Sequence, residues 1–136
     1  MTEKIREGGC LCGNIRYRAT GEPTGVEFCH CTMCRRAAGS PVVAWATFPR
    51  DRVQWLTESP ALFDSSAKAQ RGFCPRCGSA LLYSSRARSG WLDLTVGSFD
   101  DPESLVPTHH IFTSTRVHWV DVQKDLPAYP EAKPKN

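Results

Sequence analysis

The stretch GFCPRCGSAL, residues 72–81, contains the most specific metal-binding pattern in the sequence. Two cysteines that are separated by two residues and followed by glycine form a turn in which both thiolates can face one tetrahedral zinc ion. Such an ion needs two further ligands, which must come from elsewhere in the chain. The fold therefore depends on which distant segment supplies them.

The stretch GGCLCGNI, residues 8–15, can supply the missing ligands. Cys10 and Cys12 lie on a bend between glycines, so both sulfurs can turn toward one ion. Together with Cys74 and Cys77 they would form a closed four-cysteine zinc site, which is typical of structural zinc. Such a site would join the N-terminal hairpin to a strand pair far along the chain and would stabilise a modest core.

The stretch FCHCTMCRR, residues 28–36, contains the other three of the seven cysteines. Cys29, Cys31 and Cys34 have no obvious fourth partner. Three protein ligands and one open position are typical of catalytic zinc. The sequence therefore predicts a second, catalytic zinc at this triplet, where Arg35 and Arg36 could offset the negative charge of three thiolates.

Two other arrangements of these cysteines are open on spacing alone. In a zinc ribbon, one ion would be held by Cys31, Cys34, Cys74 and Cys77. Alternatively, a histidine could close the triplet and make it structural, the candidates being His30, His109 and His110. His30 lies between two ligands, so we expect its ring to point away from the metal and to make a hydrogen bond.

The composition favours one small cytoplasmic domain. The chain has 136 residues, of which 40% are hydrophobic and 23% charged, which is ordinary for a globular protein. The polar start MTEKIREGG lacks a signal sequence, and no apolar run is long enough to span a membrane. Thiols stay reduced in the cytoplasm, so these cysteines are better metal ligands than disulfides. A net charge of +3 without a dense basic run argues against nucleic acid.

The apolar pattern predicts a mainly β protein with one short helix. Short alternating or β-branched segments indicate strands at residues 14–19, 42–48, 52–56, 80–84, 91–96 and 110–114. In the segment 42–48, Trp45 and Phe48 should point to opposite faces. We expect core packing for both side chains, with the alternative that one of the two faces lines a pocket near the triplet. The segment TMCRRAAG, residues 32–39, predicts a helix that Thr32 caps and Gly39 ends.

The motifs together resemble the glutathione-dependent formaldehyde-activating enzyme family, which includes centromere protein V. The matching segments are GGCLCGNIRY (8–17), CHCTMCRRAAGS (29–40), RGFCPRCGSALLY (71–83), TVGSFDDP (95–102) and HIFTSTRVHWVDVQKDLPAY (110–129). The resemblance implies a β-tent of packed antiparallel sheets, stapled by two zinc ions. It assigns Cys10, Cys12, Cys74 and Cys77 to the structural zinc and Cys29, Cys31 and Cys34 to the active site. It also implies one zinc-binding domain over residues 1–129, followed by a flexible tail at 130–136.

The resemblance implies a carbon–sulfur lyase-like activity that adds glutathione or a related small thiol to formaldehyde or another small aldehyde. We expect the thiol to take the open position on the second zinc. Arg35 and Arg36 could bind a glutathione carboxylate, and Ser40 could donate to its peptide backbone. One alternative is a non-catalytic zinc-thiolate module that binds a protein partner. Another, by analogy with centromere protein V, is association with chromatin or the cytoskeleton, for which this sequence lacks a basic extension. We expect a monomer or a homodimer.

Overall fold

The structure, a computed structural model, describes residues 2–120 and 125–134 and is mainly β, as predicted. The strands within these residues are β1 (Ile5–Gly9), β2 (Arg16–Thr20), β3 (Gly25–Cys29), β4 (Val43–Pro49), β5 (Val53–Trp55), β6 (Ala61–Ser66), β7 (Ala69–Phe73), β8 (Ala80–Ser85), β9 (Trp91–Thr95) and β10 (His109–Ile111). The α-helix is α1 (Thr32–Ala38). Short 3₁₀ turns are η1 (Arg50–Arg52), η2 (Arg86–Arg88), η3 (Val96–Ser98), η4 (Pro102–Ser104), η5 (Thr113–Thr115) and η6 (His118–Val120).

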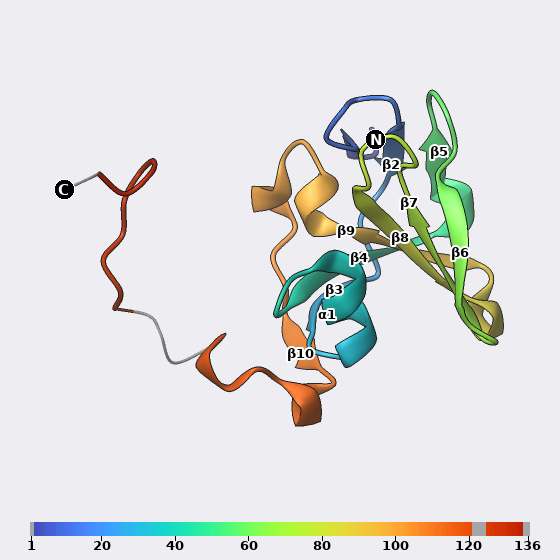
Figure 1. The fold of residues 1–136 in the computed structure, drawn as a ribbon. Coiled ribbons are helices and arrows are strands. Elements are labelled where there is room, and N and C mark those ends of the chain that lie inside the picture. The colour runs from blue at the N-terminus through green and yellow to red at the C-terminus, as the bar shows by residue number, and fades with distance from the viewer. Residues whose placement is uncertain (1, 121–124, 135–136) are drawn as a thin grey trace.

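The strands form two sheets, which Figure 1 shows together with α1. The smaller sheet has the order β1-β2-β5, and the larger has the order β10-β3-β4-β9-β8-β7-β6. The prediction of antiparallel sheets is confirmed for every strand pair except one, because β10 runs parallel to β3. Strands β9 and β10 run in the same direction, because β4 is antiparallel to both β3 and β9 and β10 is parallel to β3. The chain that connects β9 to β10 must therefore cross over the sheet.

The main core is formed where residues from the two sheets meet. Along β2, Tyr17 and Ala19 are fully buried while Arg16 and Arg18 are partly exposed, as the alternating pattern predicted. The ring of Tyr17 meets the ring of Phe99 edge to face, with 5.2 Å between the centroids. Its hydroxyl shares a hydrogen bond of 2.7 Å with Ser98 Oγ, so the buried phenol has a polar partner.

Strand β4 has two buried faces, which confirms the predicted split between Trp45 and Phe48. Phe48 is fully buried in the main core, together with Ala46. Trp45 belongs to a smaller cluster on the opposite face, together with Cys29 and Cys34. Strand β4 therefore separates the main core from the triplet.

The helix α1 ends where the sequence predicted, but its cap lies one residue earlier than predicted. Gly39 ends the helix in the left-handed conformation with φ of 64°, and its N–H donates to the carbonyl of Arg35. The N-cap is Cys31 and not Thr32, because Cys31 Sγ accepts a hydrogen bond from the N–H of Cys34 at 3.2 Å. One sulfur of the triplet therefore also fixes the start of the helix.

Other differences from the predicted elements have local causes. Strands β1, β3, β6 and β7 were not among the predicted segments, because glycine and polar residues obscure their apolar patterns. The segment predicted as a strand over 110–114 leaves the sheet after Ile111. Phe112 takes the left-handed conformation with φ of 56°, which turns the chain out of the sheet.

Residues 125–134 are exposed throughout and lie away from the two sheets (Figure 1). The predicted tail begins within this segment at residue 130, and its residues 135 and 136 lie outside the described part. The boundary at residue 129 stays a prediction. Over 2–120 and 125–134, the structure contains no helix with the length and apolar character needed to cross a membrane.

Candidate functional site

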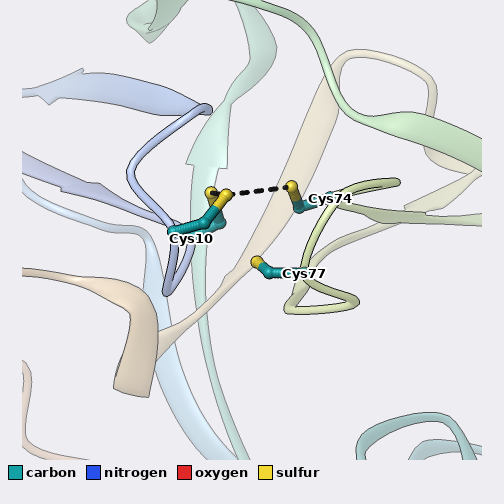
Figure 2. Close-up of side chains that lie close together, drawn as sticks. Cys10, Cys74 and Cys77 are labelled. Carbon is teal, nitrogen blue, oxygen red and sulfur yellow. Dashed lines mark hydrogen bonds between the residues drawn. The ribbon is translucent and has the colours of Figure 1, made fainter.

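The first cysteine group joins the two loops whose cysteines were predicted to share one zinc ion. The sulfurs of Cys10, Cys12, Cys74 and Cys77 all lie within 4.8 Å of one another. Figure 2 shows Cys10, Cys74 and Cys77 reaching toward one another from the two loops. The sulfurs of Cys10 and Cys12 are 3.6 Å apart, and those of Cys12 and Cys74 are 3.8 Å apart. A tetrahedral zinc with Zn–S bonds of about 2.3 Å separates its sulfurs by about 3.8 Å, so the group fits this metal.

Backbone turns hold these sulfurs in place. Gly13 and Gly78 both adopt φ of +80°, which permits the tight turn after each cysteine pair. The N–H of Ile15 donates to Cys10 Sγ at 3.2 Å. The two loops are also joined directly, since the N–H of Leu11 donates to Ser79 Oγ at 3.0 Å. The structure therefore places all four thiols as one closed group between distant segments.

The triplet forms a separate group at the junction of β3 and α1. Cys29 ends β3, Cys31 caps the helix, and Cys34 lies in its first turn. Their sulfurs lie within 4.8 Å of one another, and those of Cys29 and Cys34 are 3.5 Å apart. The zinc-ribbon alternative is therefore wrong, because Cys31 and Cys34 do not group with the CxxC pair.

The histidines do not close the triplet. His30 is buried, and its Nε2 shares a hydrogen bond of 2.8 Å with Nδ1 of His110, which agrees with the prediction that its ring points away from the metal. The ring of His110 stacks on Phe28. Across the described residues, no histidine or carboxylate joins the three sulfurs. An ion bound to these sulfurs would keep one side for a further ligand.

The triplet opens into a cavity of about 570 Å³. One wall is the larger sheet, where Thr47, Asp93, Tyr83 and Arg71 are successive cross-strand neighbours on β4, β9, β8 and β7. Directly opposed residues of antiparallel strands project on the same face, so these four form one row. The triplet and Phe112 also line the cavity.

Arg71 connects the sheet wall to the triplet. Both terminal nitrogens of its guanidinium lie 3.5 Å from Cys34 Sγ, and the group sits over the ring of Tyr83 at 5.0 Å from the centroid. Cys29 donates a hydrogen bond to Cys34, and this bond together with Arg71 lowers the pKa of Cys34 to about 5. The same bond raises the pKa of Cys29. Of these two thiols, Cys34 is therefore the one that loses its proton more readily.

A negative region lies further along the same row. Asp93 accepts a hydrogen bond from the hydroxyl of Thr47, and Glu27 also lines the cavity. Burial raises the pKa of Asp93, and burial and the charge of Asp93 raise the pKa of Glu27. The cavity therefore has Arg71 near the sulfurs, and beyond Tyr83 it has two carboxyl groups with Arg88 nearby.

The predicted substrate-binding residues lie elsewhere. Arg35 and Arg36 are on α1 but do not line the cavity at the triplet. Ser40 Oγ donates to the carbonyl of Val42 at 2.7 Å and lines a second cavity of about 620 Å³. Their proposed contacts with glutathione stay predictions. Arg71 lies in the quoted stretch RGFCPRCGSALLY, but its direction depends on the pairing of β7 with β8, which spacing does not specify.

Comparison with known proteins identifies the family. The pattern of the glutathione-dependent formaldehyde-activating enzyme family matches residues 5–115. The chain belongs to this family. The matched range, residues 5–115, includes both cysteine groups, Arg71 and Asp93.

Individual relatives agree with this assignment. An uncharacterized lyase of Schizosaccharomyces pombe is 35% identical over 77 residues, which cover 57% of this chain and 56% of that protein. The chain therefore spans little more than half of that relative. A putative glutathione-dependent formaldehyde-activating enzyme of Halomonas elongata is 25% identical over 132 residues, covering 88% of this chain and 82% of that protein.

A solved structure has the same fold. The crystal structure of a Rhodobacter sphaeroides protein superposes with a TM-score of 0.59 and 20% identity, covering 76% of this chain and 98% of that chain. At this level of identity the similarity concerns the fold alone.

Proposed function

We propose that the protein is a zinc-dependent, carbon–sulfur lyase-like enzyme. It adds glutathione or a related small thiol to formaldehyde or another small aldehyde, or reverses that addition. The observation that carries this proposal is the triplet of Cys29, Cys31 and Cys34, which opens on one side into a cavity that also holds Arg71. The names of the two sequence relatives, a lyase and a formaldehyde-activating enzyme, support the same reaction class.

The two cysteine groups suit zinc in different roles. Cys10, Cys12, Cys74 and Cys77 would hold a structural ion, since four thiolates complete its coordination. Cys29, Cys31 and Cys34 would hold the second ion. With three thiolate ligands this ion would be a weak Lewis acid, which suits the stabilisation of a thiolate in the cavity better than the activation of water.

The side chains of the cavity would perform the remaining tasks. Arg71 places a positive charge beside the sulfurs and favours the deprotonated form of a thiol that approaches them. The aromatic side chains of Trp45 and Phe112 line the cavity and limit the access of water. In the addition, the thiol sulfur forms a bond to the carbonyl carbon, the carbonyl π pair moves to oxygen, and that oxygen takes the proton the thiol has lost.

The alternative of a non-catalytic zinc-thiolate module requires a fourth protein ligand at the second ion. Within residues 2–120 and 125–134 no histidine or carboxylate joins the triplet. An accessible side facing a cavity supports an enzyme rather than a closed binding module.

Titration calorimetry of glutathione into zinc-loaded protein tests the proposal, with the metal content measured on the same sample. We expect saturable binding by the wild type, and loss of both that binding and one zinc per chain in Cys34→Ala. Exchange NMR should then show faster interconversion of glutathione, formaldehyde and S-(hydroxymethyl)glutathione with the wild type than without protein. Unchanged binding and exchange rate in Cys34→Ala would disprove the assignment of the triplet.

A further inference from the structure

We infer that Asp93 binds the ammonium group of the substrate thiol, and that the site therefore selects thiols that carry an α-amino acid group. This inference rests on the proposed function and narrows its substrate class. None of the sequence motifs pointed to Asp93, which lies in the middle of β9.

The position of Asp93 sets the length of the ligand that could reach it. Asp93 and Arg71 are separated by one residue, Tyr83, in the row that crosses β9, β8 and β7. Adjacent strands lie about 4.8 Å apart, so the two backbone positions are about 10 Å apart along the cavity wall. Arg71 extends to Cys34 Sγ. A ligand whose sulfur lies at the triplet would thus meet Asp93 only with a group several bonds away.

The surroundings of Asp93 compensate its charge only in part. Its hydrogen-bond partner is Thr47, and over residues 2–120 and 125–134 it forms no ion pair. Burial raises the pKa of Asp93 by more than the hydrogen bond from Thr47 and the charge of Arg88 lower it. The carboxyl group of Glu27, whose own pKa the charge of Asp93 raises, adds negative charge nearby. A partly buried carboxylate that forms no ion pair is unfavourable, and an ammonium group placed beside it would relieve that penalty.

Arg88 is a second charged residue near Asp93 in the cavity. Arg88 is exposed and lines the cavity. Its positive charge lowers the pKa of Asp93, although the two side chains do not form an ion pair. A carboxylate acceptor and a guanidinium donor side by side match the ammonium and carboxylate of one α-amino acid. The cavity therefore offers three features: a sulfur position at the triplet, an ammonium position at Asp93 and a carboxylate position at Arg88.

This arrangement favours a thiol such as a γ-glutamyl-cysteine peptide over a thiol without an amino acid group. Glutathione carries the required group at the end of its γ-glutamyl arm. Glutaryl-cysteinylglycine is the same molecule without the amine, so the pair isolates the contribution of the ammonium. The comparison can be made on the wild type alone, and it does not depend on how any variant folds.

The experiment is calorimetric titration of both thiols into zinc-loaded wild type, Asp93→Asn and Asp51→Asn. Asn is nearly isosteric with Asp and can still accept the hydrogen bond of Thr47. Asp51 is exposed on η1 and does not line the cavity, so its variant controls for the change in net charge. We expect the wild type and Asp51→Asn to bind glutathione at least about tenfold more tightly than its desamino analogue, and Asp93→Asn to bind the two thiols almost equally.

The outcomes separate the inference from the function on which it rests. If the wild type binds both thiols with equal affinity, the ammonium site is wrong while the thiol-binding function stands. The same conclusion follows if Asp93→Asn retains the full preference. If the wild type binds neither thiol with both zinc ions present, the proposed function fails and the inference fails with it.

Discussion

Both terminal nitrogens of Arg71 lie 3.5 Å from the sulfur of Cys34, although the two residues belong to different elements, β7 and α1. The contact places a permanent positive charge beside a group of three thiols. The guanidinium also lies over the ring of Tyr83, and this contact helps to orient it toward Cys34. Arg71 is the cation of the cavity that the structure ties most directly to the predicted catalytic centre.

Replacing Arg71 should weaken thiol binding. We expect Arg71→Gln to reduce the affinity of the zinc-loaded protein for glutathione by about tenfold or more, because charge-assisted hydrogen bonds contribute about 1.5–3 kcal/mol. Arg71→Lys should be intermediate, since it keeps the charge and loses the planar fork. Calorimetry measures the affinity, and the zinc content shows whether the triplet is intact.

The control for this prediction is Arg52→Gln. Arg52 is exposed and pairs with Glu3 away from the cavity, so this variant should bind as the wild type does. A loss of binding in Arg36→Gln but not in Arg71→Gln would instead favour the assignment made from the sequence.

Loss of the four-cysteine group should affect stability more than loss of the triplet. Cys12→Ser should lower the free energy of unfolding by several kcal/mol, because the group joins loops that are 62 residues apart and metal binding is coupled to folding. In Cys31→Ser, serine is itself a good N-cap, so the helix should persist while activity falls. Urea unfolding measured with and without a chelator checks both variants. A chelator that leaves the unfolding midpoint of the wild type unchanged would contradict a structural metal.

Two strand glycines should respond differently to alanine. A Cβ at Gly8 would lie 2.5 Å from both Ser98 O and the hydroxyl of Tyr17, which are fixed by the core. We expect Gly8→Ala to destabilise the fold by about 1–3 kcal/mol, as overpacking does. A Cβ at Gly25 would meet nothing within 4 Å, so Gly25→Ala should be within about 0.5 kcal/mol of the wild type or slightly stabilising. Thermal unfolding of both variants measures this difference. Equal melting temperatures would contradict the predicted clash of an alanine at residue 8 with Ser98 and Tyr17.

Asp93→Asn should raise stability at neutral pH. Burial raises the pKa of Asp93 in the folded state, so ionisation of this carboxyl opposes folding above that pKa. As the pH falls through the raised pKa and then below the ordinary value near 3.8, the penalty disappears and the variant should lose its advantage. The other charged or titratable groups around Asp93 are Glu27, Tyr83, Arg88 and Cys34.

Melting temperatures of wild type and Asp93→Asn between pH 7 and pH 4 test this dependence. Asp51→Asn serves as the control, because Asp51 is exposed and should show no such trend. A variant less stable than the wild type at pH 7 would mean that the charge of Asp93 already has a partner in the protein.

Sequence reasoning predicted the grouping of the cysteines and part of the fold. The division of seven cysteines into four and three followed from ligand number and residue type, and the structure places the thiols in these two groups. The alternation in β2 and the two faces of β4 also followed from side-chain period. Arg35 and Arg36 were chosen because they follow the triplet in sequence, whereas the arginines that line the cavity are Arg71 and Arg88.

The sequence by itself determined which atoms could bind a metal, where the helix ends, and which side chains along a strand share a face. These properties depend on residue type and on local backbone geometry. The tertiary structure decided which strands are neighbours and in what register, including the parallel pairing of β10 with β3. Asp93, Tyr83 and Arg71 are distant in sequence and form one wall of the cavity only because β9, β8 and β7 pair in one particular alignment. Strand register depends on the packing of whole sheet faces, so it cannot be predicted from a local sequence pattern.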